Sequence, residues 1–323
     1  MTGTAARARK ARQPDWIAPM LATLTETYFS DPNWIFERKF DGERVLTFVK
    51  RGEPKLFSRN RILLNGNYPE LVDAFEECTD TDLVVDGEVV AFDGAQTSFA
   101  KLQPRMQTRN TDEARRSRVR VYYYLFDVLH ADGYDATWLG VRERKKLLKE
   151  TVSFRDPLRF TTHRVGTGER FHDEACRKGW EGVIAKRADA PYTSGRSRDW
   201  LKFKCVRDQE LVIGGFTDPQ GSRTGFGALL VGYYDDGRLR YAGKVGTGYN
   251  ARLLTELRER LDAIERESSP FADNVREKGS HWVRPQVVAQ IGFTEWTRDG
   301  KLRHPRFLGL RRDKKAREVV RET

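Results

Sequence analysis

The sequence predicts an α+β domain followed by a smaller domain made almost entirely of β-strands. Three observations predict this organisation. The chain has 323 residues, more than one typical domain contains. Apolar strand-like runs and helix-like segments both occur in the first two-thirds. After residue 206 the pattern changes to short strands and glycine-rich turns with one helix-like stretch.

The first domain is predicted to be dominated by strands. Its strand-like apolar runs are residues 34–36, 44–49, 83–92, 121–128, 182–185 and 200–206. Helix-like segments between them include residues 69–77 and 142–150. Residues 108–120 carry many charges without a strong apolar pattern, which predicts an exposed loop and only secondarily a contact with a phosphate backbone.

The second domain is predicted to contain short strands at residues 210–216, 227–234, 239–243 and 287–296. One helix is predicted over residues 251–267. Its apolar residues recur at helical spacing: Leu253, Leu254, Leu257, Leu261 and Ile264. This pattern by itself supports no more than a small all-β domain.

The charge balance favours a polyanionic partner. The chain has 58 Lys and Arg against 47 Asp and Glu, a net charge of +11. Each phosphate that Lys or Arg neutralises releases a counterion, so a basic surface suits nucleic acid, although a basic soluble protein is the plain alternative. Residues 1–13 contain four basic residues and no acid, which predicts a mobile basic arm or, more weakly, a transit peptide.

The sequence predicts a cytosolic protein. No apolar stretch approaches the length of a membrane span, and the N-terminus lacks a hydrophobic signal core. Cys78, Cys176 and Cys205 lie far apart without CxxC spacing, so we expect reduced, structural cysteines. Strand alternation places Cys205 on the face opposite Lys202 and Lys204.

Lys39 is a candidate covalent nucleophile. It lies between an apolar strand-like run and the turn Phe40-Asp41-Gly42. A lysine amine attacks only when neutral, and its ordinary pKa of ~10.4 leaves almost none neutral at physiological pH. Burial and neighbouring cations lower such a pKa. A surface lysine before a turn is the alternative, and the motif alone is weak.

Further short polar motifs follow at the ends of apolar runs. They are Ser58-Arg59-Asn60, Asp86-Gly87-Glu88, Phe126-Asp127, Glu181-Gly182-Val183 and Lys202-Phe203-Lys204. In order and spacing they resemble the nucleotidyltransferase motifs of ATP-dependent DNA ligases and mRNA capping enzymes. The ending Arg303-His304-Pro305-Arg306-Phe307, with Arg311-Arg312-Asp313-Lys314, resembles the C-terminal ligase motif. The whole is most similar to the ligase domain of bacterial ligase D.

The resemblance implies a fold and a division of the chain. Residues 1–16 would be the basic arm and residues 17–206 a nucleotidyltransferase (adenylation) domain of antiparallel sheets with helices. Residues 207–323 would form an all-β domain of the oligonucleotide-binding (OB) fold, with the hinge near residues 205–209.

The resemblance also implies a lysine-AMP intermediate. Lys39 would attack the α-phosphorus of ATP and expel pyrophosphate. AMP would then pass to the 5′-phosphate of a DNA break, and the 3′-hydroxyl would displace it. Lys202 and Lys204 share one strand face, so both would lower the pKa of Lys39 and hold the α-phosphate. Alternating lysines on a plain solvated strand are the alternative.

Other residues are assigned to nucleotide and metal by the same resemblance. Glu88 and Glu181 would bind the ribose and Mg²⁺, with Mn²⁺ as a possible substitute, although each is also a plausible surface Gly-Glu turn. Arg44 and Arg59 would contact phosphate or ribose. Phe126 would stack on the purine or simply belong to the core. Glu37 would lie near the adenine or pair with Arg38 or Lys186.

The second domain is expected to take part in the first step only. Arg311, Asp313 and Lys314 would act on the β- and γ-phosphates during adenylylation, after which the domain would swing away so that DNA can bind. Gly214-Gly215 and residues 221–227, which include Arg223, are predicted glycine-rich loops that let the backbone approach a duplex closely.

The predicted function is therefore ATP-dependent sealing of nicked or broken duplex DNA by a monomer in the bacterial cytosol. Ku and separate polymerase and nuclease proteins are expected partners by analogy with ligase D. Two alternatives stay open: a GTP-dependent mRNA capping guanylyltransferase, and an inactive nucleic-acid-binding module. An RNA ligase fits less well because of the second domain and its closing motif.

Overall fold

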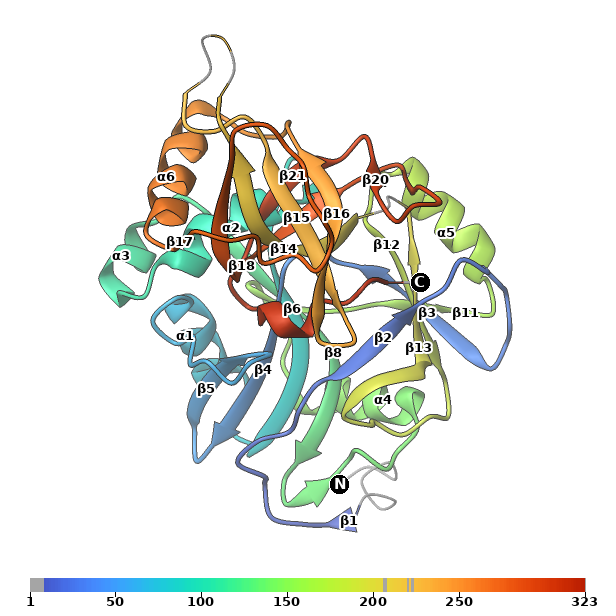
Figure 1. Cartoon of the computed structure of the whole chain (residues 1–323). Helices are drawn as coiled ribbons and strands as arrows, with labels where there is room; N and C mark the ends of the chain where they lie inside the picture. The colour runs from blue at the N-terminus through green and yellow to red at the C-terminus, as the bar shows by residue number, and fades with distance from the viewer. Residues whose placement is uncertain (1–8, 206–207, 220, 222–223, 323) are drawn as a thin grey trace. The chain divides into compact units, whose positions relative to one another are not determined.

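The computed structural model describes residues 9–205, 208–219, 221 and 224–322. The chain divides into two compact units, residues 1–205 and 206–323, and the division falls beside the predicted hinge. Figure 1 shows the elements of both units coloured along the chain. Within the described residues, no helix is long and apolar enough to cross a membrane.

The first unit contains two mostly antiparallel sheets. Sheet A has the strand order β1-β9-β8-β6-β4-β5, and β10 and β7 pair with β8 and β6. Its strands are β1 Arg9–Lys10, β4 Glu43–Lys50, β5 Glu53–Ser58, β6 Leu83–Asp93, β7 Gln96–Thr97, β8 Val121–Ala131, β9 Tyr134–Asp135 and β10 Leu158–Phe160. Sheet B has the order β11-β3-β12-β13-β2. Its strands are β2 Met20–Leu24, β3 Trp34–Lys39, β11 His163–Val165, β12 Gly182–Arg187 and β13 Gly195–Lys204.

Within residues 9–205, five helices accompany these sheets: α1 Pro69–Cys78, α2 Phe99–Gln107, α3 Thr111–Arg116, α4 Val141–Thr151 and α5 Gly168–Arg177. Helices α1, α2 and α4 cover one face of sheet A over a core that includes Phe75, Leu102 and Leu148. A second core, with Phe126 from β8 and Trp200 from β13, fills the space between the sheets. Helix α5 covers the other face of sheet B. The candidate site therefore lies on two sheets that are each backed by helices.

The described part of the second unit has a main sheet with one α-helix packed on it. The sheet has the order β16-β15-β14-β18-β17, with β21 paired to β18. Its strands are β14 Asp208–Thr217, β15 Leu229–Asp235, β16 Arg238–Val245, β17 Glu265–Arg266, β18 Ser280–Gly292 and β21 Arg306–Arg311, and β19 Glu295–Trp296 pairs with β20 Leu302–Arg303. Helix α6, Ala251–Asp262, buries its leucines in the core, and a short 3₁₀ helix follows at Ala316–Glu318.

Three local predictions need correction. The predicted loop at residues 108–120 contains α3, because the Asn110 side chain accepts hydrogen bonds from two backbone N–H groups of its first turn. Helix α6 ends before Ile264, since Glu265–Arg266 pairs with β18. Gly214-Gly215 lies inside β14, where a Cβ on Gly214 would come within 2.4 Å of the Phe271 ring. These two glycines serve packing, and Arg223 lies outside the described residues.

The predicted basic arm is also corrected where the structure describes it. Arg9–Lys10 pairs with β9 as strand β1. The Gln13 side chain is buried and donates hydrogen bonds to the carbonyls of Val49 and Leu83, both at 3.1 Å. Residues 9–16 therefore belong to the first unit, while residues 1–8 lie outside the described part of the chain.

The cysteines differ from the prediction as well. Cys176 and Cys205 form a disulfide, and Cys78 is buried and free. Cys205 does lie on the face opposite Lys202 and Lys204, where it packs with Phe203. On that face α5 brings Cys176 beside it, a proximity that a sequence separation of 29 residues does not reveal.

Candidate active site

Lys39 is the last residue of β3 and is held by the turn that follows. The Asp41 backbone N–H donates to Thr97 Oγ1 at 3.3 Å, and the Asp41 carboxylate accepts from the Phe99 N–H at 3.1 Å. A Cβ on Gly42 would lie 2.2 Å from the Val89 carbonyl oxygen, so the turn requires glycine. The Lys39 side chain is thereby fixed at a strand end while 18% exposed.

The Lys39 ammonium forms an ion pair with Glu181, which directly precedes β12. The Glu181 side chain is 15% exposed, so this pair is partly buried. Beyond the cations predicted around Lys39, the structure places an anion in direct contact with it. A neighbouring carboxylate favours the protonated amine. Lys39 must therefore leave Glu181 before its amine can act as a nucleophile.

Strand register places Lys204 on the same face as Lys39. Gly182 of β12 is opposite Lys39 on one side and opposite Lys204 on the other. Gly182 has φ +152°, and a Cβ there would lie 2.0 Å from the Phe203 carbonyl oxygen. No side chain thus stands between the two lysines. Lys202 lies on the same face two residues earlier.

Glu37 lies deeper on this face and is tied to two lysines. It is 2% exposed and pairs with Lys145 of α4 and with Lys186 of β12, the latter at 2.7 Å. Burial alone would raise the pKa of Glu37, but the two lysines outweigh burial and hold the pKa below its ordinary value. Arg38 and Lys186 were the two possible partners of Glu37, and the structure confirms Lys186. Arg38 instead lies over the Trp180 ring at 4.4 Å.

Arg44 is oriented by a buried carboxylate on sheet A. Its Nη2 donates to Asp86 at 2.6 Å and to the Met20 carbonyl at 3.2 Å. The Tyr192 hydroxyl donates to the same Asp86 at 2.6 Å. Burial works against the charged form, yet Asp86 raises the pKa of Arg44 above its ordinary value. Arg44 is thus a fixed cation.

Phe126 belongs to the core, one of the two placements considered for it. Its ring is 8% exposed in the core between the sheets, with the Arg44 guanidinium 4.6 Å and the Lys186 ammonium 4.3 Å from its centroid. The Phe126 ring thus lies between Arg44 and Lys186, the lysine that pairs with Glu37. The neighbouring Asp127 forms a fully buried ion pair with Arg144 of α4 at 2.7 Å.

Glu88 and Arg59 lie on sheet A near Arg44. Glu88 is half-buried in β6, directly opposite Arg44 on one side and Tyr124 on the other. Arg59 is half-buried and follows β5, whose last residue Ser58 is opposite Val45. Both therefore lie at the end of β4 that carries Arg44.

The remaining candidates belong to the second unit. Arg311 ends β21 and binds Asp313 through two hydrogen bonds of 3.0 and 2.8 Å. Lys314 pairs with Glu210 at 3.1 Å. Burial would raise the pKa of Asp313, but Arg311 and Lys314 hold it below its ordinary value.

Sequence reasoning missed several residues of the first unit. Asp86 and Tyr192 fix Arg44, and Lys145 holds Glu37. Asp86 belongs to the motif Asp86-Gly87-Glu88, so the sequence did contain a signal for it. Lys145 and Arg144 are buried charges on α4, and a charged helix face gives no such signal because lysine and arginine are mostly exposed.

Comparison with known families decides the membership. Residues 19–204 match the model of the ATP dependent DNA ligase domain, and residues 222–314 match that of the ATP dependent DNA ligase C terminal region. The chain belongs to the ATP-dependent DNA ligase family. Both matches describe DNA ligases, so the capping-enzyme alternative is not favoured.

Known relatives agree with this assignment. The multifunctional non-homologous end joining protein LigD of Pseudomonas aeruginosa is 40% identical over 324 residues, which cover 97% of this chain and 37% of that protein. The multifunctional non-homologous end joining DNA repair protein LigD of Mycobacterium tuberculosis is 38% identical, with 97% and 41% covered. The chain thus spans less than half the length of these relatives.

Solved structures confirm the fold class. A mycobacterial DNA ligase D complexed with ATP and MES matches with a TM-score of 0.66 and 36% identity, over 94% of this chain and 98% of that one. The ligase domain of M. tuberculosis LigD matches with a TM-score of 0.51 and 37% identity over the same shares. The fold is a nucleotidyltransferase domain followed by an OB-fold-like ligase domain, as predicted.

Proposed function

We propose that this chain seals 5′-phosphate and 3′-hydroxyl ends of duplex DNA through AMP carried on Lys39. The observation that carries the proposal is the alignment of Lys39 and Lys204 across Gly182, with Glu181 in contact with the Lys39 amine. A fixed lysine, a neighbouring cation and a carboxylate are the groups that an amine nucleophile and a phosphate require.

The chemistry then follows in three displacements at phosphorus. The Lys39 amine attacks the α-phosphorus of ATP, the bond to pyrophosphate breaks with its electron pair, and the amine loses its proton. A 5′-phosphate oxygen next attacks that phosphorus and breaks its bond to Lys39. Finally the 3′-hydroxyl attacks the 5′-phosphorus and AMP leaves. Lys202, Lys204 and the fixed Arg44 would stabilise phosphate charge through these steps.

Glu88 and Glu181 fit a magnesium ion by donor chemistry. Glu88 offers carboxylate oxygens from the middle of β6 and Glu181 from the residue before β12, and Mg²⁺ prefers oxygen ligands while keeping several waters. When bound, Mg²⁺ or Mn²⁺ would neutralise phosphate charge. Phe126 and Glu37 would border the purine, Phe126 by stacking. Arg59 would contact phosphate or ribose beside Arg44.

The second unit would act on the leaving pyrophosphate. Arg311 and Lys314 are cations beside a buried carboxylate, Asp313, which holds the Arg311 guanidinium in one orientation. We propose that they bind the β- and γ-phosphates during adenylylation and are not needed once AMP is on DNA. The step then requires motion between the two units.

Labelling tests the nucleophile and the nucleotide together. The chain is incubated with Mg²⁺ and with ATP or GTP labelled at the α-phosphate, and covalent label is measured after denaturation. We expect label from ATP alone, none in Lys39→Ala, and normal label in the control Lys50→Ala, an exposed lysine at the end of β4. Covalent label in Lys39→Ala would show that Lys39 is not the nucleophile. Label from GTP, or from neither nucleotide, would contradict ATP-dependent ligation.

We further propose a role in end joining, drawn from the names of the LigD relatives. In this proposal the chain acts as a monomer in the bacterial cytosol. Its partners are Ku and separate polymerase and nuclease proteins. The affinity for DNA should fall steeply as the salt concentration rises and should not depend on the base sequence, because contacts with phosphates dominate the binding free energy. Sealing of nicked, cohesive and blunt duplexes with and without Ku tests it, and a blunt-end rate that Ku leaves unchanged contradicts the Ku partnership.

A further inference from the structure

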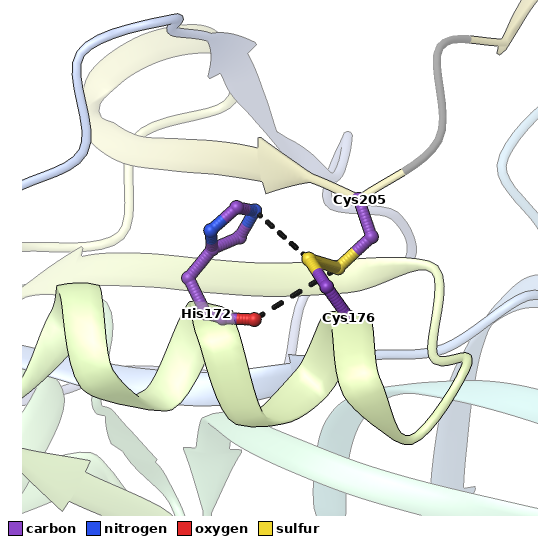
Figure 2. Close-up of side chains that lie close together, drawn as sticks. All are labelled: His172, Cys176 and Cys205. Atoms are coloured by element: carbon purple, nitrogen blue, oxygen red, sulfur yellow. Dashed lines mark hydrogen bonds between the residues drawn. A yellow bond between two sulfur atoms is a disulfide. The ribbon is translucent and has the colours of Figure 1, made fainter.

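A compact group of soft metal-binding side chains lies on the far side of sheet B. Figure 2 shows His172 and Cys176 one turn apart on α5, facing Cys205 just after β13. The Cys176 Sγ is 3.4 Å from His172 Nε2, and the three ligand atoms all lie within 4.8 Å of one another. The two sulfur atoms are joined as a disulfide.

The spacing of these atoms suits a thiophilic metal. Zinc binds Cys sulfur at about 2.3 Å and His nitrogen at about 2.0–2.1 Å in a tetrahedron, so a bound sulfur and nitrogen lie about 3.5 Å apart. The observed distance of 3.4 Å from Cys176 to His172 is close to this edge. The α-carbons of the two cysteines are 5.1 Å apart, so the two thiols of the reduced pair remain neighbours.

We propose that His172, Cys176 and Cys205 form a redox-gated metal site, which binds Zn²⁺ when the disulfide is reduced. A dithiol reductant supplies two electrons and two protons, so that the Cys176–Cys205 bond becomes two thiols while the reductant becomes a disulfide. Zinc binding then displaces the two thiol protons. The three protein ligands leave a fourth position for water, and the metal and the disulfide exclude each other.

The surroundings hold the histidine in place. The His172 side chain is 7% exposed, and its ring lies 3.9 Å from the Tyr28 ring. Cys176 and Cys205 are half-buried, so an ion can reach them from solvent. A cytosolic disulfide is commonly transient, which fits a pair that alternates between two states.

The site also touches the strand that carries the active-site lysines. His172 Nε2 lies 3.3 Å from the Lys204 carbonyl oxygen, which also accepts from the Tyr28 hydroxyl at 3.2 Å. Zinc would use the lone pair of Nε2, so the hydrogen bond to Lys204 would be lost on metal binding. The Cys205 N–H donates to the Glu181 carbonyl at 3.0 Å. The proposed metal site therefore borders the backbone of both Lys204 and Glu181.

Zinc binding by the full chain tests the site without DNA or nucleotide. The protein is reduced with a phosphine, desalted, equilibrated with Zn²⁺ and dialysed, and bound zinc is measured by atomic spectroscopy. We expect one equivalent in the reduced protein and in Cys78→Ala, whose cysteine lies buried in another core. We expect at least a tenfold loss in Cys176→Ser and Cys205→Ser, and in the oxidised wild type.

Co²⁺ gives a second readout that reports the ligands themselves. The reduced wild type should show sulfur-to-cobalt charge-transfer absorption, and His172→Ala should weaken Co²⁺ binding while keeping that band. Reduced protein that binds no more zinc than Cys176→Ser, or oxidised protein that binds equally, overturns the proposal. Lys39→Ala should bind zinc normally, so failure of the ligase proposal leaves this result unaffected.

Discussion

Sheet B carries two lysine–glutamate pairs that differ in burial. Glu37 and Lys186 are each 2% exposed in their side chains, and Lys145 adds a second cation. Lys39 and Glu181, at the end of the same strands, are 18% and 15% exposed and form an ion pair. A buried charge that loses its partner is costly, whereas a pair near water can exchange partners. The same residue types thus form a buried structural support around Glu37 and, at Lys39, a more exposed pair that contains the proposed nucleophile.

Removing the buried carboxylate should have the largest effect. In Glu37→Gln, Lys145 and Lys186 remain buried without their anion, so the free energy of unfolding should fall by about 3–5 kcal/mol. Urea unfolding at neutral pH measures this. The exposed Glu76→Gln on α1 is the control and should change little. A loss as small as that of the control would show that the pair is not a structural support.

Glu181→Gln should lower the rate of adenylylation strongly and the stability only slightly. Because its pair is near solvent, the free energy of unfolding should fall by only about 1–2 kcal/mol. The rate of adenylylation should fall about 10²-fold, because the proposed Mg²⁺ ligand is lost and with it part of the positive charge that stabilises the phosphates, which outweighs the release of Lys39 from its carboxylate. Single-turnover labelling with ATP measures the rate. If Glu181→Gln were adenylylated at the wild-type rate but lost much of its unfolding free energy, Glu181 would be a structural support and not an active-site group.

Arg311→Ala should separate the two halves of the reaction. Adduct formation should slow about tenfold, because a cation that binds the leaving pyrophosphate is lost. Sealing of a nick that already carries a 5′-adenylate should be unchanged. Arg317→Ala, an exposed arginine in the same segment, is the control. Equal slowing of both steps would mean that Arg311 supports the fold or binds DNA.

The pH dependence gives the smallest and most specific signal. The pKa of Glu37 is lower in the folded chain than its ordinary value of 4.5, so Glu37 contributes its full stability above that value. The contribution disappears as the pH falls through the folded pKa. The difference in unfolding free energy between wild type and Glu37→Gln should therefore shrink below pH 4.5. A constant difference would contradict this account.

Much of the fold could be predicted because it depends on local pattern. The apolar runs of β4, β6 and β8 and the helical spacing in α1 and α4 are visible in the sequence, and the structure has these elements. Helix α3 was missed because its stability comes from the Asn110 cap rather than from an apolar stripe. Helix α5 was missed too.

The site could be predicted in part only. The alternation of Lys202 and Lys204 placed both on one face, and the structure agrees. Partners across strands were beyond reach, since the contact of Lys39 with Glu181 joins residues 142 positions apart. The prediction that all three cysteines are reduced was wrong for the same reason, because only the packing of α5 on sheet B brings Cys176 to Cys205.

Peptide mapping after adenylylation tests the central claim most directly. The chain is treated with ATP and Mg²⁺, digested, and each lysine is examined by mass spectrometry for added AMP. The difference in burial predicts AMP on Lys39 and none on Lys186, although both lie on sheet B beside a glutamate. AMP on Lys186, or an unmodified Lys39, would contradict the claim that the solvent-near pair contains the nucleophile.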